Sequence, residues 1–318
     1  MGMAVPLALA PMAGVSDLPY RLLARECGAD ITITEFTSSA GLSREVANSW
    51  LKLESDEREK PFIPQIFGGD VNEMVTTVEM LQGKADIIDL NFGCPAPKIT
   101  KICAGAALMG QPDDLVAITE ACIDASDVPV TAKLRMGTGY MENNIVELAP
   151  RLEDAGVMRL CVHGRTLKQR YTGEADWGTI REVVEAVDIP VFANGDITDA
   201  QSAQDCLETT QAAGLMIGRG AIGRPMIFNE IKSELGWCNS DSPWDSVDDF
   251  AIRSWCWNRY LELARETTGL QSKWLNRHAV AFTKGLPGAK NARKVITKDR
   301  DTEAVASGIQ NWLQEKSA

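Results

Sequence analysis

Eight short apolar segments alternate with longer segments of helical periodicity, and this alternation constrains the fold more than any other feature of the sequence. The expected strands lie at residues 7–10, 31–34, 62–67, 87–91, 130–135, 159–163, 191–194 and 215–217. The expected helices lie at 16–27, 71–82, 112–126, 143–155, 177–187 and 198–208, with weaker patterns at 42–50 and 225–234. Strands separated by helices imply right-handed βαβ units and a parallel sheet. Eight repeats favour an α/β fold of the closed (β/α)8 TIM-barrel type, although periodicity alone leaves an open doubly wound sheet possible.

The pattern changes after residue 236. Residues 236–243 are rich in turn formers, and beyond them apolar and aromatic residues recur at helical spacing, first over 250–264. Further helical stretches are expected at 272–284, 289–297 and 302–314. We therefore predict a barrel domain over residues 1–236 and a small all-helical domain over 244–318.

The charge is unevenly distributed along the chain. The net charge of −12 argues against an unselective binder of polyanions. Residues 271–318 nevertheless hold nine lysines and arginines against four acidic residues, a net charge of +5, which leaves −17 on the remainder. A basic end on an acidic protein indicates that a polyanion such as nucleic acid is held there, and a solvated helix surface without a partner is the alternative.

The cysteines and histidines argue against a metal site. The chain has eight cysteines, no Cys-x-x-Cys pair and two histidines, so a zinc site of the usual spacing is not expected. Dispersed cysteines fit a reducing cytoplasm better than a disulfide framework. The apolar start of the chain is expected to be a strand and not a signal peptide, and no run is long enough to cross a membrane.

One cysteine lies where a barrel places its chemistry. The apolar run 87–91 is followed by Gly93 and Pro95, two residues that end strands, and Cys94 lies between them. The C-terminal ends of barrel strands carry the active site. Cys94 is therefore a candidate catalytic residue, with a buried and inert thiol as the alternative.

The ends of the seventh and eighth expected strands are typical of a phosphate site. They read Asn194-Gly195-Asp196 and Gly218-Arg219-Gly220. Barrels often bind a phosphate at this place through backbone N–H groups, and Arg219 adds a charged donor. We therefore expect a phosphorylated cofactor, although glycine-rich loops also occur for turn geometry alone.

Two further strands end in polar residues. Lys133 interrupts an apolar strand, so it is expected either to pair with a carboxylate such as Asp89 or Glu35 or to meet a ligand. His163 ends another apolar strand, where it is either a satisfied core residue or part of the site.

Taken together, these motifs resemble the tRNA-dihydrouridine synthases. The resemblance rests on Ala-Pro-Met-Ala-Gly at 10–14, Asp-Leu-Asn-Phe-Gly-Cys-Pro at 89–95, His-Gly-Arg-Thr at 163–166, Asn-Gly-Asp-Ile at 194–197 and Met-Ile-Gly-Arg-Gly at 216–220. The motifs occur in the family's order and at its approximate spacing, and the likeness covers nearly the whole chain. The Asn-x-Gly-Cys-Pro element is highly specific, whereas related flavin barrels share parts of the others.

The resemblance implies an FMN-binding TIM barrel followed by a helical tRNA-binding domain. It implies that NADPH reduces FMN, that the flavin delivers hydride to C6 of a uracil base in tRNA, and that Cys94 donates a proton to C5. The residues expected to hold FMN are Pro11, Met12, Ala13, Gln65, Lys133, His163, Asn194, Gly195, Asp196, Gly218 and Arg219. Asn91 and Arg165 are expected on the substrate side, and the protein is expected to act as a cytoplasmic monomer.

Two other functions remain open at this stage. One is a flavin barrel that acts on a free pyrimidine, as the dihydroorotate dehydrogenases do. The other is an RNA-binding protein without catalytic activity, which needs neither FMN nor Cys94. We expect that removal of the basic helical tail disables an enzyme acting on tRNA and spares one acting on a small molecule.

Overall fold

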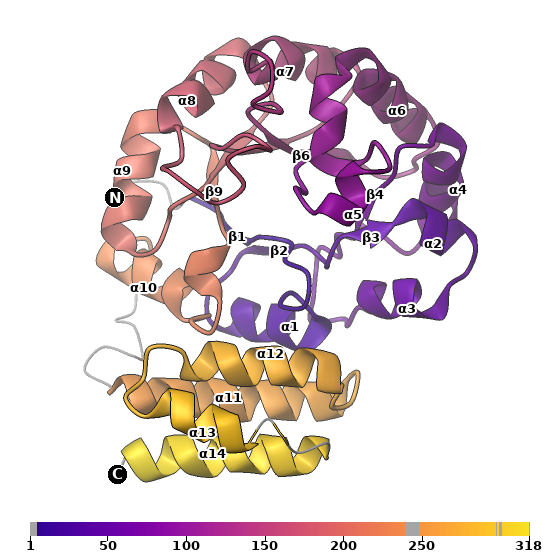
Figure 1. Ribbon diagram of the computed structural model, residues 1–318. Helices are drawn as coiled ribbons and strands as arrows, with labels where there is room; N and C mark the ends of the chain where they lie inside the picture. The colour runs from indigo at the N-terminus through magenta and orange to yellow at the C-terminus, as the bar shows by residue number, and fades with distance from the viewer. Residues whose placement is uncertain (1–4, 239–247, 297, 299–300, 318) are drawn as a thin grey trace.

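The protein, described here by a computed structural model, is a ring of parallel strands enclosed by helices, with a separate group of helices at one side (Figure 1). The structure describes residues 5–238, 248–296, 298 and 301–317. In this part of the chain nine parallel strands form one sheet in the order β2-β1-β9-β8-β7-β6-β5-β4-β3. Their bounds are β1 Leu7–Leu9, β2 Ile31–Thr32, β3 Thr37–Ser38, β4 Gln65–Phe67, β5 Ile88–Asn91, β6 Val130–Arg135, β7 Leu160–His163, β8 Val191–Asn194 and β9 Gly214–Ile217.

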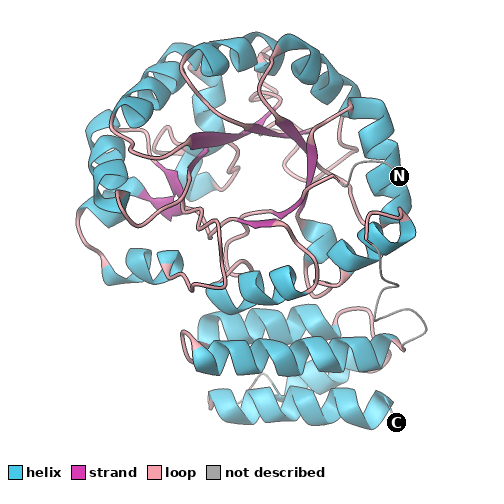
Figure 2. Cartoon of the chain, turned by 180° about the vertical axis from the view of Figure 1, so that it is seen from behind, coloured by secondary structure: helices cyan, strands magenta, loops and turns pink. Residues whose placement is uncertain are grey.

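The helices that follow the strands cover the outside of the ring, as the view from behind also shows (Figure 2). They are α1 Leu18–Glu26, α2 Ser39–Ser43, α3 Ala47–Trp50, α4 Val71–Leu81, α6 Pro112–Asp124, α7 Ile145–Asp154, α8 Trp177–Ala186, α9 Ala200–Thr210 and α10 Ile227–Glu234. The short helix α5 Pro97–Thr100 lies inside this circle of helices (Figure 1). Short 3-10 turns lie at η1 Leu51–Leu53, η2 Gly105–Gly110 and η3 Arg219–Ala221. The (β/α)8 TIM-barrel class predicted from the sequence is thus confirmed.

Aspartate caps begin several of these helices. Asp70, Asp176 and Asp199 each accept a hydrogen bond from a backbone N–H three residues later, at the starts of α4, α8 and α9. The hydroxyl oxygen of Ser202 accepts a hydrogen bond from the backbone N–H of Asp199, which completes a capping box. These caps fix where the chain leaves each strand-end loop and enters its helix.

The second strand position of the barrel differs from the prediction of one strand over 31–34. It is divided into β2, which pairs with β1, and β3, which pairs with β4. Between them the backbone N–H of Thr34 bonds to the carbonyl of Ile63 at 3.1 Å, so the ring is bridged at the break. Glu35 lies in this break. The predicted strand over 62–67 is also shortened to Gln65–Phe67, because Pro61 and Pro64 have no N–H to give to a ladder.

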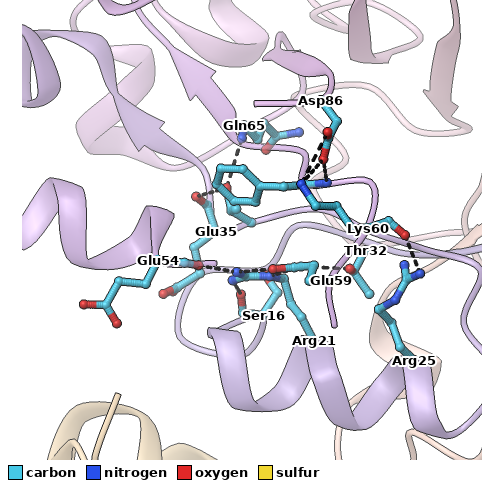
Figure 3. Close-up of polar contacts among 12 residues, drawn as sticks. Ser16, Arg21, Arg25, Thr32, Glu35, Glu54, Glu59, Lys60, Gln65 and Asp86 are labelled. Atoms are coloured by element: carbon cyan, nitrogen blue, oxygen red, sulfur yellow. Dashed lines mark hydrogen bonds and ion pairs between the residues drawn. The ribbon is translucent and has the colours of Figure 1, made fainter. Parts of the chain in front are cut away.

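A buried ion pair anchors α1 beneath the loop that leaves β1 (Figure 3). Arg21 bonds to both carboxylate oxygens of Glu59, at 2.5 and 2.8 Å, and both side chains are fully buried. The same guanidinium donates to the carbonyls of Ser16 and Glu54. Arg21 therefore ties together α1, the β1–α1 loop and the segment before β4.

The C-terminal helices pack against the barrel beside α1, as Figure 1 shows. Their bounds are α11 Asp249–Glu266, α12 Ser272–Thr283, α13 Ala289–Ile296 and α14 Thr302–Ser317. Helix α11 contacts α1, and Arg259 of α11 forms an ion pair of 2.8 Å with Glu26. The four helical stretches expected from the sequence are confirmed. Much of the expected turn-rich linker, residues 239–243, lies outside the described residues, and the domain boundary itself stays a prediction.

Within the described ranges, no helix is long and apolar enough to span a membrane. The same part of the chain holds no cluster of three or more His, Cys, Asp or Glu side chains that could bind a metal ion.

Candidate functional site

A cavity of about 1020 Å³ opens at the C-terminal ends of the strands. Loops after β1, β5, β7, β8 and β9 and the end of β6 line it, which is the place where barrels carry their active sites. The strand register brings the polar side chains together, because Asn91 pairs with Lys133, Arg135 with His163, and His163 with Asn194 on neighbouring strands. The residues expected from the sequence that line this cavity are Pro11, Met12, Ala13, Asn91, Cys94, Lys133, His163, Asn194, Gly195, Asp196, Gly218 and Arg219.

Cys94 lies in this cavity and is held by its own loop. The side-chain Oδ1 of Asn91 accepts hydrogen bonds from the backbone N–H groups of Gly93 and Cys94, at 3.0 and 2.9 Å. The carbonyl of Cys94 accepts a further bond from Ala106 at 3.1 Å. Burial raises the pKa of the Cys94 thiol, and the opposing effects of a nearby backbone N–H and of two cations do not cancel this. The group is therefore a protonated thiol at neutral pH.

A chain of hydrogen bonds continues from Asn91 into the barrel interior. Asn91 donates through Nδ2 to Gln65 Oε1 at 2.7 Å, and Gln65 donates through Nε2 to Asp89 Oδ2 at 2.6 Å. Asp89 also accepts from the hydroxyl of Thr131. Gln65 is fully buried and does not line the cavity, so the structure places it one layer behind Asn91.

Lys133 reaches the cavity and bonds to a side chain of the same rim. Its Nζ donates to Asn194 Oδ1 at 2.9 Å, and Asn194 donates to the carbonyl of Met216 at 2.7 Å. Of the alternatives left open by the sequence, a direct ion pair with Asp89 or Glu35 is therefore not the one observed. Burial lowers the pKa of Lys133. A partly buried ammonium group that faces an open cavity is a ready donor for an anionic or carbonyl-bearing ligand.

His163 lies beside Lys133 at the same rim and is neutral. Burial, reinforced by the positive charges of Lys133, Arg135 and two further arginines, lowers the pKa of His163 far below its usual range. A neutral imidazole can donate one hydrogen bond to a ligand and accept another.

The loops after β8 and β9 form a site with free backbone donors. Among the described residues, no hydrogen bond is made by the backbone N–H groups of Gly218, Arg219 and Gly220. Gly195 adopts a φ of +128°, and a Cβ there would lie 2.7 Å from the Cβ of Ala175, so only glycine allows this loop to close up. Consecutive free N–H groups next to a guanidinium form an anion site.

Asp196 connects two arginines at this end of the cavity. It bonds to Arg165 at 2.6 Å and to Arg219 at 2.9 Å. Partial burial alone would raise the pKa of Asp196, but the hydrogen bonds from Arg165 and from the N–H of Ala175, with the charge of Arg219, lower it. Arg165 is buried and does not line the cavity. It holds Asp196 and the 172–173 backbone from behind.

The cavity is strongly cationic although the whole chain carries a net charge of −12. Among the residues that the structure describes, six basic side chains and one carboxylate, Asp196, line it. The basic residues are Lys133, Arg135, Arg170, Arg219, Arg277 and Lys284. A concave surface of one sign concentrates ligands of the opposite sign, so the cavity favours phosphates and other anions.

Several lining residues were not expected from the sequence. Tyr171 lies between two guanidinium groups, with its ring centroid 5.6 Å from Arg135 and 5.2 Å from Arg219. Arg277 and Lys284 come from α12 and the residue that follows it, so the C-terminal helices contribute to the cavity. The excess of basic residues after position 271 indicated a polyanion at that end, but it gave no sign that two of them reach the barrel.

Known proteins resemble this chain over nearly its whole length. The family model for dihydrouridine synthase (Dus) matches residues 8–316. The chain is 44% identical over 315 residues to tRNA-dihydrouridine synthase B of Pseudomonas putida, which covers 98% of this chain and 92% of that protein. It is 36% identical over 313 residues to tRNA-dihydrouridine synthase B of Pseudomonas aeruginosa, covering 98% and 93%. The protein of the same name from Escherichia coli K12 is 43% identical over 230 residues, 72% of each chain. Because the family model matches residues 8–316, this chain belongs to the dihydrouridine synthase family.

Proposed function

We propose that this protein is a tRNA-dihydrouridine synthase, a cytoplasmic flavoenzyme that uses FMN and NADPH to reduce a uridine of tRNA to 5,6-dihydrouridine. The observation that carries the proposal is the cationic cavity in which a protonated thiol, Cys94, faces the same space as a set of free backbone donors at Gly218–Gly220. The relatives that match nearly the whole chain carry this name.

The cavity fits FMN in size and in chemistry. Its volume of about 1020 Å³ is at the upper end of the roughly 300–1,000 Å³ usual for cofactor sites, which leaves room for a substrate base beside a flavin. The free N–H groups of residues 218–220, Arg219 and the Asn194-Gly195-Asp196 loop would hold the phosphate. Pro11, Met12 and Ala13 would contact the ring from the β1 side, and Lys133 and His163 would bond to its polar edge. FMN, reduced by NADPH, supplies the hydride that is added to C6 of the uracil.

Cys94 is the proposed acid. Its thiol is protonated at neutral pH and lies in the cavity, so it can give its proton to C5 of the uracil. Asn91 fixes the loop that carries Cys94. Asn91 also lines the cavity, so its side chain can bond to the base. A uracil must leave its stack to reach this depth, as bases do in other enzymes that modify them.

Gln65 and Arg165 are proposed to act indirectly. The sequence suggested that Gln65 contacts FMN and that Arg165 contacts the substrate, but neither lines the cavity. Gln65 holds the amide of Asn91, and Arg165 holds Asp196 next to Arg219. We therefore propose that both orient residues that touch the ligands.

The alternative enzyme, one that reduces a free pyrimidine, needs a different test from removal of the helical domain. Arg277 and Lys284 line the cavity, so removal of their domain would damage the cavity for any substrate. The full chain should instead be supplied with FMN, NADPH and either unmodified tRNA or free uridine and uracil. Mass spectrometry of the products should show dihydrouridine in tRNA and none from the free pyrimidines. Equal reduction of free pyrimidines would contradict the tRNA assignment, and a chain that binds no FMN would contradict the whole proposal.

A further inference from the structure

Side chains on one face of α12 contact the loop that follows β1. Trp274, Arg277 and His278 have the spacing i, i+3 and i+4, so their side chains leave the helix on the same side. Arg277 donates to the carbonyl of Ala13 at 2.8 Å, and His278 Nε2 lies 2.7 Å from Asp17 Oδ1. Both contacted residues belong to the β1–α1 connection.

Glu35 forms a second link between α12 and this loop. Trp274 Nε1 donates to Glu35 Oε2 at 2.8 Å, and Glu35 Oε1 accepts from the backbone N–H of Gly14. Glu35 and Trp274 are almost fully buried. A buried carboxylate that accepts one bond from each side forms strong contacts, because these donors replace the hydrogen bonds that water would otherwise supply.

Gly14 shows how closely the two parts approach. Its φ of +75° lies in the left-handed region, and a Cβ there would lie 2.5 Å from Nη1 of Arg277. The loop takes this shape with the guanidinium packed against it. The neighbouring residues Met12, Ala13 and Val15 line the cavity, as Arg277 itself does.

We propose that α12 is a positioning element of the FMN site, in which Trp274 acts through Glu35 and Gly14 to hold the flavin-contacting loop in shape. FMN affinity then depends on the docked helical domain. RNA that binds the helical domain in its docked position favours the same loop shape, and because coupling is reciprocal, RNA and FMN then raise each other's affinity by the same factor. This inference rests on the proposed function, since it assumes FMN as the cofactor and tRNA as the substrate.

Other contacts between the two domains lie away from the cavity and provide a control. Arg259 pairs with both carboxylate oxygens of Glu26 at 2.8 Å, and neither residue lines the cavity. The substitution Arg259→Gln removes a link between the same two domains without touching the loop. A comparison with this variant therefore separates the effect of the loop contacts from the effect of holding the two domains together.

The test uses the full chain without RNA. Trp274→Phe keeps an aromatic ring in place and removes the N–H that bonds to Glu35. Glu35→Gln replaces one of the two accepting oxygens with an NH2 group, which then faces an N–H donor of either Gly14 or Trp274. FMN affinity of the apoproteins is measured by fluorescence titration, and we expect each variant to bind FMN about 3- to 10-fold more weakly, as the partial loss of one charge-assisted hydrogen bond implies. Because both substitutions break the same bond between Trp274 and Glu35, the double variant should bind FMN no more weakly than the worse single variant. Arg259→Gln should bind FMN as the wild type does.

A second measurement tests the reciprocity. The affinity for tRNA is compared between apoprotein and FMN-loaded protein, and the gain on loading should be present in the wild type and in Arg259→Gln and reduced in Trp274→Phe. Thermal unfolding of the apoproteins identifies a variant that merely loses its fold. If Trp274→Phe is such a variant, Glu35→Gln provides the test of FMN affinity in its place. If wild type and both loop variants bind FMN equally, the inference is overturned while the proposed function stands. If Arg259→Gln loses as much FMN affinity as Trp274→Phe, the contacts only hold the domains together. If the wild type binds no FMN, the proposed function itself fails.

Discussion

Asn91 and Cys94 are joined by a hydrogen bond of 2.9 Å from the backbone N–H of Cys94 to Asn91 Oδ1. The amide of Asn91 is itself oriented from below, because its Nδ2 donates to Gln65 and Gln65 donates to Asp89. Asp89 accepts a hydrogen bond at each of its oxygens, from Gln65 and from Thr131, so Gln65 turns its NH2 group to Asp89 and its oxygen to Asn91. The position of the proposed acid is thus set by the barrel interior.

We expect Asn91→Ala to loosen Cys94 without removing it. Product formation should fall about 100-fold, the effect of displacing a reacting group by roughly 1 Å. Alkylation of Cys94 should become faster, and peptide mapping can measure it against the exposed Cys103 of the same chain. The control is Asn144→Ala, which removes a hydrogen bond between a side-chain amide and the backbone, from Asn144 Nδ2 to the carbonyl of Met109, outside the cavity. Unchanged alkylation in Asn91→Ala would contradict the positioning role.

The proton transfer from Cys94 should persist into alkaline solution. The donor is the protonated thiol, so the rate falls as the pH rises through its pKa, and burial holds that pKa above the ordinary thiol value. Single-turnover oxidation of the reduced, flavin-loaded enzyme by tRNA, followed against pH, measures this fall in rate at alkaline pH. Cys94→Ala should bind FMN normally, show no such fall, and react about 100- to 10,000-fold more slowly. A rate that already falls between pH 6 and 8 in the wild type would show that another group is the acid.

Arg219 should discriminate between FMN and riboflavin, which lacks the phosphate. Loss of a charged donor to the phosphate should weaken FMN binding by roughly 10- to 100-fold in Arg219→Leu. Riboflavin binding should hardly change, because Arg219 lies at the anion end of the cavity. Arg224→Leu is the control, since Arg224 follows on the same loop, pairs with Glu230 and does not line the cavity. Equal losses for both ligands in Arg219→Leu would place the phosphate elsewhere.

The barrel and the rim of the cavity could be predicted from the sequence because they depend on local signals. Alternation of apolar runs and helical segments predicts a parallel sheet, eight repeats favour a barrel, and in a parallel barrel all strand ends meet at one rim. Cys94, Lys133, Asn194 and Arg219 could therefore be assigned to one site without knowledge of their contacts.

The contacts behind the rim could not be predicted in this way. Gln65 pairs in register with Asp89, below the rim, so a residue type suited to the site lies one layer too deep to line it. The bond between Glu35 and Trp274 joins residues 239 positions apart in the chain. It depends on how the helical domain docks and on the break between β2 and β3, and neither has a periodic signal in the sequence.

The buried pair of Arg21 and Glu59 should dominate the stability of the barrel near this loop. Both side chains are fully buried, and Glu59 also accepts from the hydroxyl of Thr32 at 2.9 Å. Glu59→Gln leaves the guanidinium charge buried without its counter-ion, so the free energy of unfolding should fall by about 3–5 kcal/mol. The control is Glu185→Gln, which breaks a solvent-exposed pair between Arg181 and Glu185 of α8. It should lower the free energy of unfolding by about 0.5 kcal/mol or less. Urea denaturation of the two variants measures the difference. Equal losses would show that water or a rearranged backbone compensates the charge of Arg21.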